Sequence, residues 1–238
     1  MKRLKLSLPK DDQIKEIHFQ MRRMVNAGYT GRDQEAVKKH IEQLKKEGIP
    51  LPGLTPTVYE MNTQLIYFDD EMEEIEVVGN KTSGEAEFIL LYDGKEVYVG
   101  VGSDHTDREL EVTSIIKSKQ ICPNLMSRRI WLLKDVRKDW DELMLRSWVK
   151  NDEGLKGLYQ EASLSSMMTP EDLMAFVQGE MDDKNLEGVV IYSGTIPTLT
   201  TGANYNNYFE VELSNPKTGK KLHCSYKVRV LDYLRGRE

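Results

Sequence analysis

The sequence of 238 residues predicts a mainly β protein of the α+β class, in which an N-terminal helical hairpin precedes a β domain. Short apolar or alternating segments recur along the chain, and turn sequences such as Asp93-Gly94 separate them, which predicts strands joined by tight turns. Near the N-terminus, apolar residues follow helical spacing up to Gly28, and again up to Gly48, which predicts two helices.

The N-terminal region is expected to contain one strand and these two helices. Alternating leucines predict the strand over residues 2–8. The helices are expected over residues 11–28 and 32–47. A proline-rich segment follows the second helix and marks a boundary, so residues 1–54 are assigned to this region and residues 55–238 to the β domain.

The β domain is expected to be built from short strands and one later helix. Thr169 suits a helix N-cap, because Pro170 and two acidic residues follow it. A central hairpin is expected to turn at Asp93-Gly94. The other expected strands lie at residues 57–61, 64–68, 75–78, 129–133, 143–148, 188–192, 208–213 and 222–230.

Composition excludes several classes of protein. The net charge is −6 and the pI is near 5.4, and no basic face of the size that nucleic acid requires is evident. No apolar run approaches the length of a membrane span. With two cysteines and no signal-peptide pattern, the expected compartment is the cytoplasm.

Three carboxylates are expected to converge in the central hairpin. Glu85 and Glu87 are two residues apart, so their side chains share one face of a strand. Ser103 or Asp104 can cap a short helix that runs through Glu111, which places Asp104 at the end of the second strand, near the two glutamates. The alternative is that the glutamates form a solvated strand face and that Asp104 is only a helix cap.

A hard divalent cation would relieve the repulsion between three such carboxylates. Mg²⁺ or Mn²⁺ suits an all-oxygen site, and Ca²⁺ is a further candidate.

The stretch from Gly84 to Pro123 resembles the core of the fumarylacetoacetate hydrolase superfamily. The landmarks of that superfamily are a Glu-x-Glu strand, an Asp-x-Ser/Thr-x-Arg segment, a lysine-containing strand that ends in proline, and a Gly-Thr-Pro turn. The matching residues here are Glu85, Glu87, Asp104, Thr106, Arg108, Lys117 or Lys119, Pro123 and Gly194-Thr195-Ile196-Pro197. The chain resembles most an uncharacterised bacterial branch, through Ser-Gly-Glu-x-Glu-Phe, Gly-Ser-Asp-His-Thr-Asp-Arg and Ser-Lys-Gln-x-Cys-Pro.

The resemblance implies a mixed β-roll and a role for each matching residue. Glu85, Glu87 and Asp104 would bind the metal. Arg108 and either Lys119 or Lys117 would bind substrate oxygens; both lysines are expected on one side of a strand, so the choice stays open. Gly194 and Thr195 would hold the carboxylate of the substrate.

The implied activity is that of a metal-dependent enzyme acting on a small 2-oxoacid or 1,3-dicarbonyl compound through a metal-bound enolate. Hydrolysis of a C–C bond, decarboxylation and related lyase reactions share that intermediate. The resemblance also implies a homodimer. The alternative function is that of a non-catalytic small-molecule binding protein that retains the fold.

Two departures from the superfamily pattern affect this interpretation. Superfamily hydrolases place a histidine upstream of Glu-x-Glu, but no histidine lies between His40 and His105. His105 is therefore the expected substitute general base, or else a residue that orients a ligand. Glu111 stands where the superfamily has glutamine, which adds negative charge near the expected substrate site.

Overall fold

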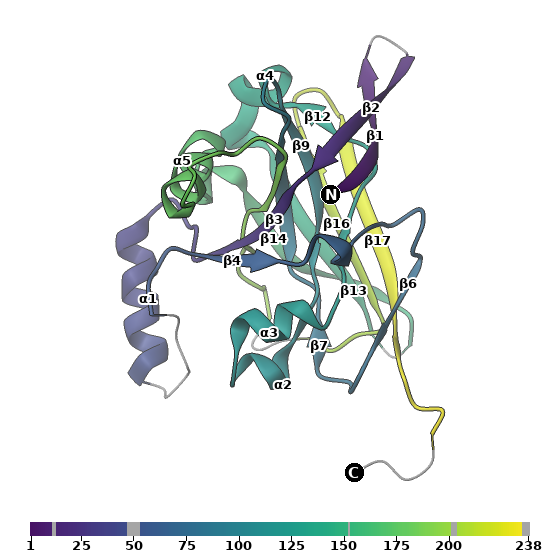
Figure 1. Ribbon diagram of the computed structural model, residues 1–238. Helices are drawn as coiled ribbons and strands as arrows, with labels where there is room; N and C mark the ends of the chain where they lie inside the picture. The colour runs from purple at the N-terminus through teal and green to yellow at the C-terminus, as the bar shows by residue number, and fades with distance from the viewer. Residues whose placement is uncertain (11–12, 47–52, 152, 201–203, 235–238) are drawn as a thin grey trace.

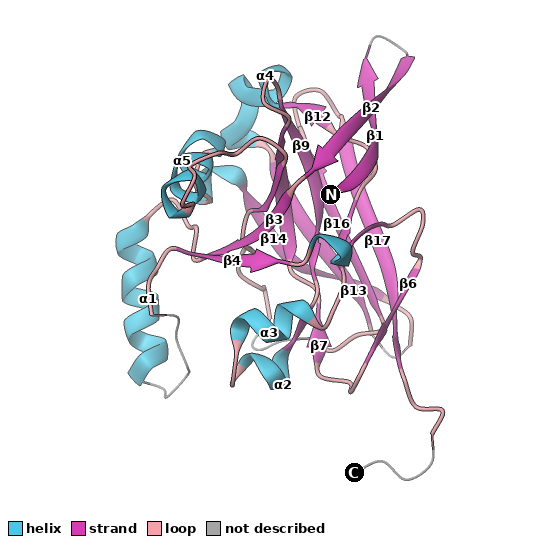
Figure 2. Cartoon of the chain, in the orientation of Figure 1, coloured by secondary structure: helices cyan, strands magenta, loops and turns pink. Residues whose placement is uncertain are grey.

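Two β-sheets pack face to face in this protein, and a separate N-terminal hairpin covers part of the larger sheet (Figures 1 and 2). The structure is a computed structural model that describes residues 1–10, 13–46, 53–151, 153–200 and 204–234. Among these residues, no helix combines the length and apolar character that a membrane span requires.

The larger sheet has eight strands, with seven in the order β4-β3-β15-β8-β9-β11-β5 and with β12 also paired to β9. Its strands are β3 (Arg23–Gly28), β4 (Thr57–Met61), β5 (Ile66–Phe68), β8 (Ala86–Tyr92), β9 (Val97–Asp104), β11 (Asn124–Met126), β12 (Trp131–Leu132) and β15 (Val189–Tyr192). The second sheet has the order β14-β13-β16-β17-β6. Its strands are β6 (Glu74–Val77), β13 (Met144–Lys150), β14 (Lys156–Ser163), β16 (Tyr208–Ser214) and β17 (Lys221–Val230).

The remaining elements are short sheets and helices. Two small antiparallel sheets pair β1 (Lys2–Lys10) with β2 (Gln13–Met21) and β7 (Thr82–Ser83) with β10 (Thr106–Asp107). The α-helices are α1 (Gln34–Lys46), α2 (Arg108–Glu111), α3 (Ile115–Gln120), α4 (Leu133–Val136) and α5 (Pro170–Glu180). The 3₁₀ helices are η1 (Thr63–Leu65), η2 (Arg137–Glu142) and η3 (Leu164–Ser166).

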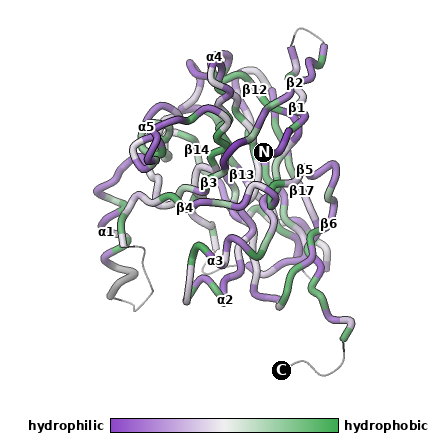
Figure 3. The backbone as a smooth tube through the Cα atoms, in the orientation of Figure 1, coloured by the Kyte–Doolittle hydropathy of each residue, from purple (hydrophilic) through white to green (hydrophobic). Residues whose placement is uncertain are grey.

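Both faces of the larger sheet are buried, each in its own hydrophobic cluster. Phe88 and Leu90 of β8 face the second sheet, and their alternating neighbours Ile89 and Leu91 face the β1–β2 hairpin. A strand that is covered on both faces is expected to be apolar throughout rather than alternating, as β8 is. Hydrophobic segments accordingly follow the strands of the two sheets (Figure 3).

The predicted N-terminal helical hairpin is wrong, because its first helix is replaced by strands β2 and β3. The apolar residues of this segment fit a period of two as well as a helical period, and β1 provides a partner: Leu4 lies opposite Phe19, and Leu6 opposite Ile17. The second predicted helix is confirmed as α1. The predicted helix start at residues 11–12, the stop at Gly48 and the proline-rich segment up to Pro52 lie outside the described residues.

The strand β3 precedes the predicted domain boundary and pairs with β4 and β15 of the larger sheet. The division into residues 1–54 and 55–238 stays a prediction.

Most of the predicted strands of the β domain form, but other elements of this domain differ from the prediction. The expected lysine-containing strand is the helix α3. The short helix before Glu111 is capped by Asp107 rather than by Ser103 or Asp104, because the Asp107 side chain accepts a hydrogen bond from the Leu110 amide. The strand β14 was not predicted, since its first three residues are exposed and lack an alternating pattern.

We expect Gly102→Ala to lower the free energy of unfolding by at least about 2 kcal/mol. A Cβ atom at Gly102 would lie 2.1 Å from the backbone oxygen of Leu125 on the adjacent strand, so the strands would have to separate. Gly157→Ala is the matched control, because a Cβ atom there meets nothing within 4 Å. Urea denaturation of both variants tests this, and equal stabilities would contradict the described packing of β9 against β11.

Candidate active site

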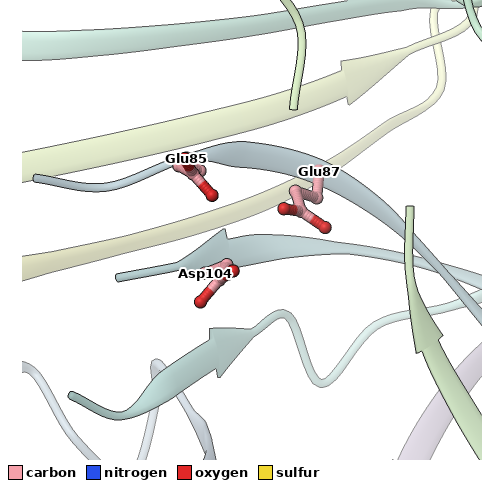
Figure 4. Close-up of side chains that lie close together, drawn as sticks. All are labelled: Glu85, Glu87 and Asp104. Atoms are coloured by element: carbon pink, nitrogen blue, oxygen red, sulfur yellow. The ribbon is translucent and has the colours of Figure 1, made fainter. Parts of the chain in front are cut away.

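The carboxylates of Glu85, Glu87 and Asp104 meet at the ends of β8 and β9 (Figure 4). Each contributes one oxygen to a group whose atoms all lie within 4.8 Å of one another. The strand register explains this convergence: Glu87 lies opposite Gly102, and Asp104 is two residues further along the same face. The predicted convergence of these three side chains is therefore present in the structure.

The backbone around the two glutamates is held by buried polar groups. The Glu85 amide donates a hydrogen bond to Ser103 Oγ (3.1 Å), and the Ala86 amide donates to Gln160 Oε1 (3.2 Å). Gln160 also accepts from Ser147 Oγ (2.8 Å), and its amide nitrogen donates to Thr195 Oγ1 (2.8 Å). It therefore connects β8 to β13 and to the turn after β15.

Sequence analysis missed Gln160, and only its buried position in the middle of β14 identifies it.

Gly194 and Thr195, which the resemblance assigns to binding of the substrate carboxylate, contact β8 in this structure. The Gly194 amide donates a hydrogen bond to Glu87 Oε2 (2.9 Å), and Thr195 Oγ1 donates to the Ala86 carbonyl (3.1 Å). Gly194 has a φ of +85°, and a Cβ atom there would lie 2.7 Å from Thr30 Oγ1. The turn thus requires glycine, and it positions Glu87.

Two cations contact the carboxylates. Lys119 Nζ lies 2.5 Å from Asp104 Oδ2 and 2.9 Å from Glu85 Oε2. Arg108 contacts Glu85 Oε1 (3.0 Å) and Glu111 Oε2 (2.9 Å), and its Nε donates to Ser83 Oγ (2.7 Å).

The structure brings Lys119 into the site but not Lys117. The two lysines are two residues apart on the helix α3, so their side chains leave it in nearly opposite directions, at about 200°. Lys119 is buried and Lys117 is exposed. The expectation that both lysines lie on one side of a strand is therefore wrong.

Burial and mutual repulsion govern the ionisation of the three acids. Burial opposes ionisation of Glu85, but Lys119 and Arg108 outweigh it and lower the pKa of Glu85 to about 2. Burial raises the pKa of Asp104 to about 6, against the opposing effect of Lys119. Burial, together with the charges of Asp104 and Glu85, raises the pKa of Glu87 well above its usual value.

The residues present fit a hard divalent cation. When all four carboxylates of this cluster, including Glu111, are ionised, Lys119 and Arg108 leave two negative charges uncompensated. Glu87 Oε1 and Asp104 Oδ1 are buried and have no hydrogen-bond partner among the described residues. An all-oxygen donor set of this charge suits Mg²⁺, Mn²⁺ or Ca²⁺.

Among the described residues, His105 forms its hydrogen bonds away from the three carboxylates. It follows Asp104 directly, so its side chain leaves the strand on the opposite face. Its two ring nitrogens form hydrogen bonds with Tyr226 OH (3.0 Å) and Thr82 Oγ1 (2.9 Å), and it is 1% exposed. Burial, and then the charge of Arg108, lowers the pKa of His105 to about 3. The imidazole is neutral and forms part of the core.

Comparison with known proteins gives a family and a fold. A family model described as "Protein of unknown function (DUF2848)" matches residues 27–226. The chain belongs to this family. A search of the curated proteins finds no match.

Three solved structures share the fold of this DUF2848 protein. One is 5-carboxymethyl-2-hydroxymuconate delta-isomerase from Mycobacterium smegmatis, with 13% identity, a TM-score of 0.64, and coverage of 98% of this chain and 100% of the other. Another is 2-hydroxyhepta-2,4-diene-1,7-dioate isomerase from Mycobacterium marinum, with 14% identity, a TM-score of 0.62, and coverage of 91% and 78%. The third is 2-keto-3-deoxy-D-arabinonate dehydratase, with 13% identity, a TM-score of 0.63, and coverage of 94% and 78%.

At these identities the likeness shows a shared fold, and membership of the fumarylacetoacetate hydrolase superfamily stays a prediction.

Lys119→Met is expected to lower the free energy of unfolding at pH 8 by about 3 kcal/mol, because it leaves the buried carboxylates of Asp104 and Glu85 without their shared partner. Lys117→Met, which changes an exposed lysine on the same helix, should alter it by less than about 0.5 kcal/mol. Chemical denaturation in the presence of a chelator measures both values. A Lys119 variant as stable as the Lys117 variant would contradict the described ion pairs.

The burial of His105 predicts a pH dependence of stability. The folded protein keeps this imidazole neutral down to about pH 3, whereas the unfolded chain takes up a proton below about pH 6.5, so stability falls as the pH falls between these values. Between pH 7.5 and 5.0 this loss amounts to about 2 kcal/mol. Urea denaturation of His105→Gln at the two pH values should lack this loss of about 2 kcal/mol. A variant with the same pH dependence of stability as the wild type would contradict the assignment to His105.

Proposed function

We propose that this DUF2848 protein is a divalent-metal-dependent enzyme that acts on a small 2-oxoacid or 1,3-dicarbonyl compound through an enolate. The observation that carries the proposal is the group of three carboxylate oxygens from Glu85, Glu87 and Asp104, which lies beside Arg108 and Lys119. The substrates named for the structural neighbours are keto acids and related enol or unsaturated acids, which supports the proposed substrate class.

Glu85, Glu87 and Asp104 would hold the cation, which we propose to be Mg²⁺ or Mn²⁺. When bound, it would supply a Lewis acid that polarises two oxygens of the substrate and favours the enolate form. The Gly194 amide holds Glu87, and the backbone contacts of Gln160 and Ser103 hold the strand between the two glutamates. The chain thus positions its carboxylates before any ligand binds.

Arg108 and Lys119 would bind the anionic groups of the substrate. Burial lowers the pKa of both side chains, but the neighbouring carboxylates outweigh it. Glu85 and Glu111 raise the pKa of Arg108, and Asp104 and Glu85 raise the pKa of Lys119. Both side chains therefore stay cationic at physiological pH. The side chain of Arg108 is 17% exposed and that of Glu111 is 31% exposed, which leaves this edge of the cluster open to a ligand.

The position of His105 favours a second candidate, a non-catalytic small-molecule binding protein. The expected general base is enclosed in the core, and its two nitrogens are bound to Tyr226 and Thr82. A protein that keeps the cation and the anion-binding side chains but lacks a base would bind a 2-oxoacid without turning it over.

Exchange of hydrogen at the carbon next to the keto group separates the two candidates. A panel of 2-oxoacids and 1,3-dicarbonyl compounds in D₂O, followed by proton NMR with metal-free and Mg²⁺-loaded protein, would detect formation of an enolate directly. The enzyme should accelerate the exchange in a Mg²⁺-dependent manner.

Glu87→Gln should lower the exchange rate roughly a hundredfold or more, because it removes one carboxylate of the cation site. Glu153→Gln, at an exposed residue, should leave the rate unchanged. Binding of Mg²⁺ and of a 2-oxoacid without exchange would identify a binding protein instead, and absence of Mg²⁺ and Mn²⁺ binding would contradict both candidates.

A further inference from the structure

Buried polar atoms without partners gather on one face of the larger sheet. Eight buried side-chain nitrogen or oxygen atoms of the described residues lack a hydrogen-bond partner. Six of them belong to four residues: both amide atoms of Asn26, both amide atoms of Asn124, Glu87 Oε1 and Asp104 Oδ1. The two asparagines are not among the metal ligands proposed above, and each is 0% exposed.

The strand registers place all four side chains on the same face. Asn124 of β11 lies opposite Asp104 of β9, so the two side chains are direct cross-strand neighbours. Asn26 of β3 is in register with Tyr192, which is in register with Ile89, two residues beyond Glu87. The Asn26 side chain also lies near enough to Asp104 to act on that carboxyl as a hydrogen-bond donor, although the geometry does not complete a hydrogen bond, and it lowers the pKa of Asp104 less than Lys119 does.

Another buried asparagine, Asn215, shows how the hydrogen bonds of a buried amide are completed within this protein. Asn215 is 2% exposed, and its Nδ2 donates to Asp139 Oδ2 (3.1 Å). Its Oδ1 accepts hydrogen bonds from the amides of Lys217 (2.9 Å) and Thr218 (3.3 Å). A buried amide whose hydrogen bonds are not completed is costly, so Asn26 and Asn124 favour a polar occupant beyond the described residues.

We propose that Asn26 and Asn124 form the inner wall of the cation site, where their amides hold water molecules between themselves and the free oxygens of Glu87 and Asp104. This inference rests on the proposed function, because it assigns positioning residues to the same site. An amide both donates and accepts, which suits water, and it is neutral, so it adds nothing to the negative charge already present. Mg²⁺ retains several water molecules when proteins bind it, and such a wall would hold them in place.

Asn26→Leu and Asn124→Leu test the inference, because leucine has the same branched shape as asparagine but cannot form hydrogen bonds to water. The dissociation constant for Mn²⁺, measured by isothermal titration calorimetry on the full chain, should rise about tenfold or more in each variant. The relaxation enhancement of water protons by bound Mn²⁺, measured with protein in excess, should also fall. In the chelator-treated protein, neither variant should lower the midpoint of thermal unfolding.

Asn215→Leu is the matched control. It should lower the midpoint of thermal unfolding, because it breaks three hydrogen bonds, and it should leave the dissociation constant for Mn²⁺ unchanged.

Mn²⁺ binding by the wild type and by both leucine variants with equal affinity and equal relaxation enhancement would overturn the inference while leaving the proposed function intact. Failure of the wild type to bind Mn²⁺ or Mg²⁺ would instead overturn the proposed function.

If a leucine variant does not fold, Asn124→Asp replaces it, because aspartate has the same shape. Its added charge beside Asp104 should enlarge the rise in unfolding temperature caused by Mn²⁺, and an unchanged rise would contradict the placement of Asn124.

Discussion

The grouping of four carboxylates around only two cations is the constraint on which this site depends. Glu85, Glu87, Asp104 and Glu111 lie around Lys119 and Arg108, and the resulting excess of negative charge is held in surroundings of low polarity. Such an arrangement is destabilising unless protons or a cation compensate it. The raised pKa values of Glu87 and Asp104 favour compensation by protons, and a divalent cation would provide the alternative compensation.

The register of the strands brings Glu85, Glu87 and Asp104 together on one face of the larger sheet. One face of β8 and β9 packs against the second sheet. The other face packs against the β1–β2 hairpin and carries the charged cluster. The one-residue alternation of a strand sends Asp104 into the site and His105 into the core. The pairing of β11 with β9 places Asn124 of the proposed inner wall directly beside the ligand Asp104.

Sequence analysis predicted the three carboxylates and the central hairpin because their patterns are local: an i, i+2 pair, a turn dipeptide and an apolar run. It failed where tertiary pairing decides between two local periods, as in residues 13–28, which form strands because β1 and β15 are available as partners. The choice of Lys119 over Lys117 required knowing that residues 115–120 are helical. Gln160, Asn26 and Asn124 carry no motif, and only their burial beside the carboxylates distinguishes them.

Diffraction from crystals grown with Mn²⁺, using its anomalous scattering, would show directly whether the three carboxylates bind a divalent cation. We expect a single strong anomalous peak at coordination distance, about 2.0–2.3 Å, from oxygens of Glu85, Glu87 and Asp104, and no such peak in the Glu85→Ala, Glu87→Ala variant. A peak elsewhere on the chain, or none at millimolar Mn²⁺, would show that protons and the two cations alone compensate these carboxylates.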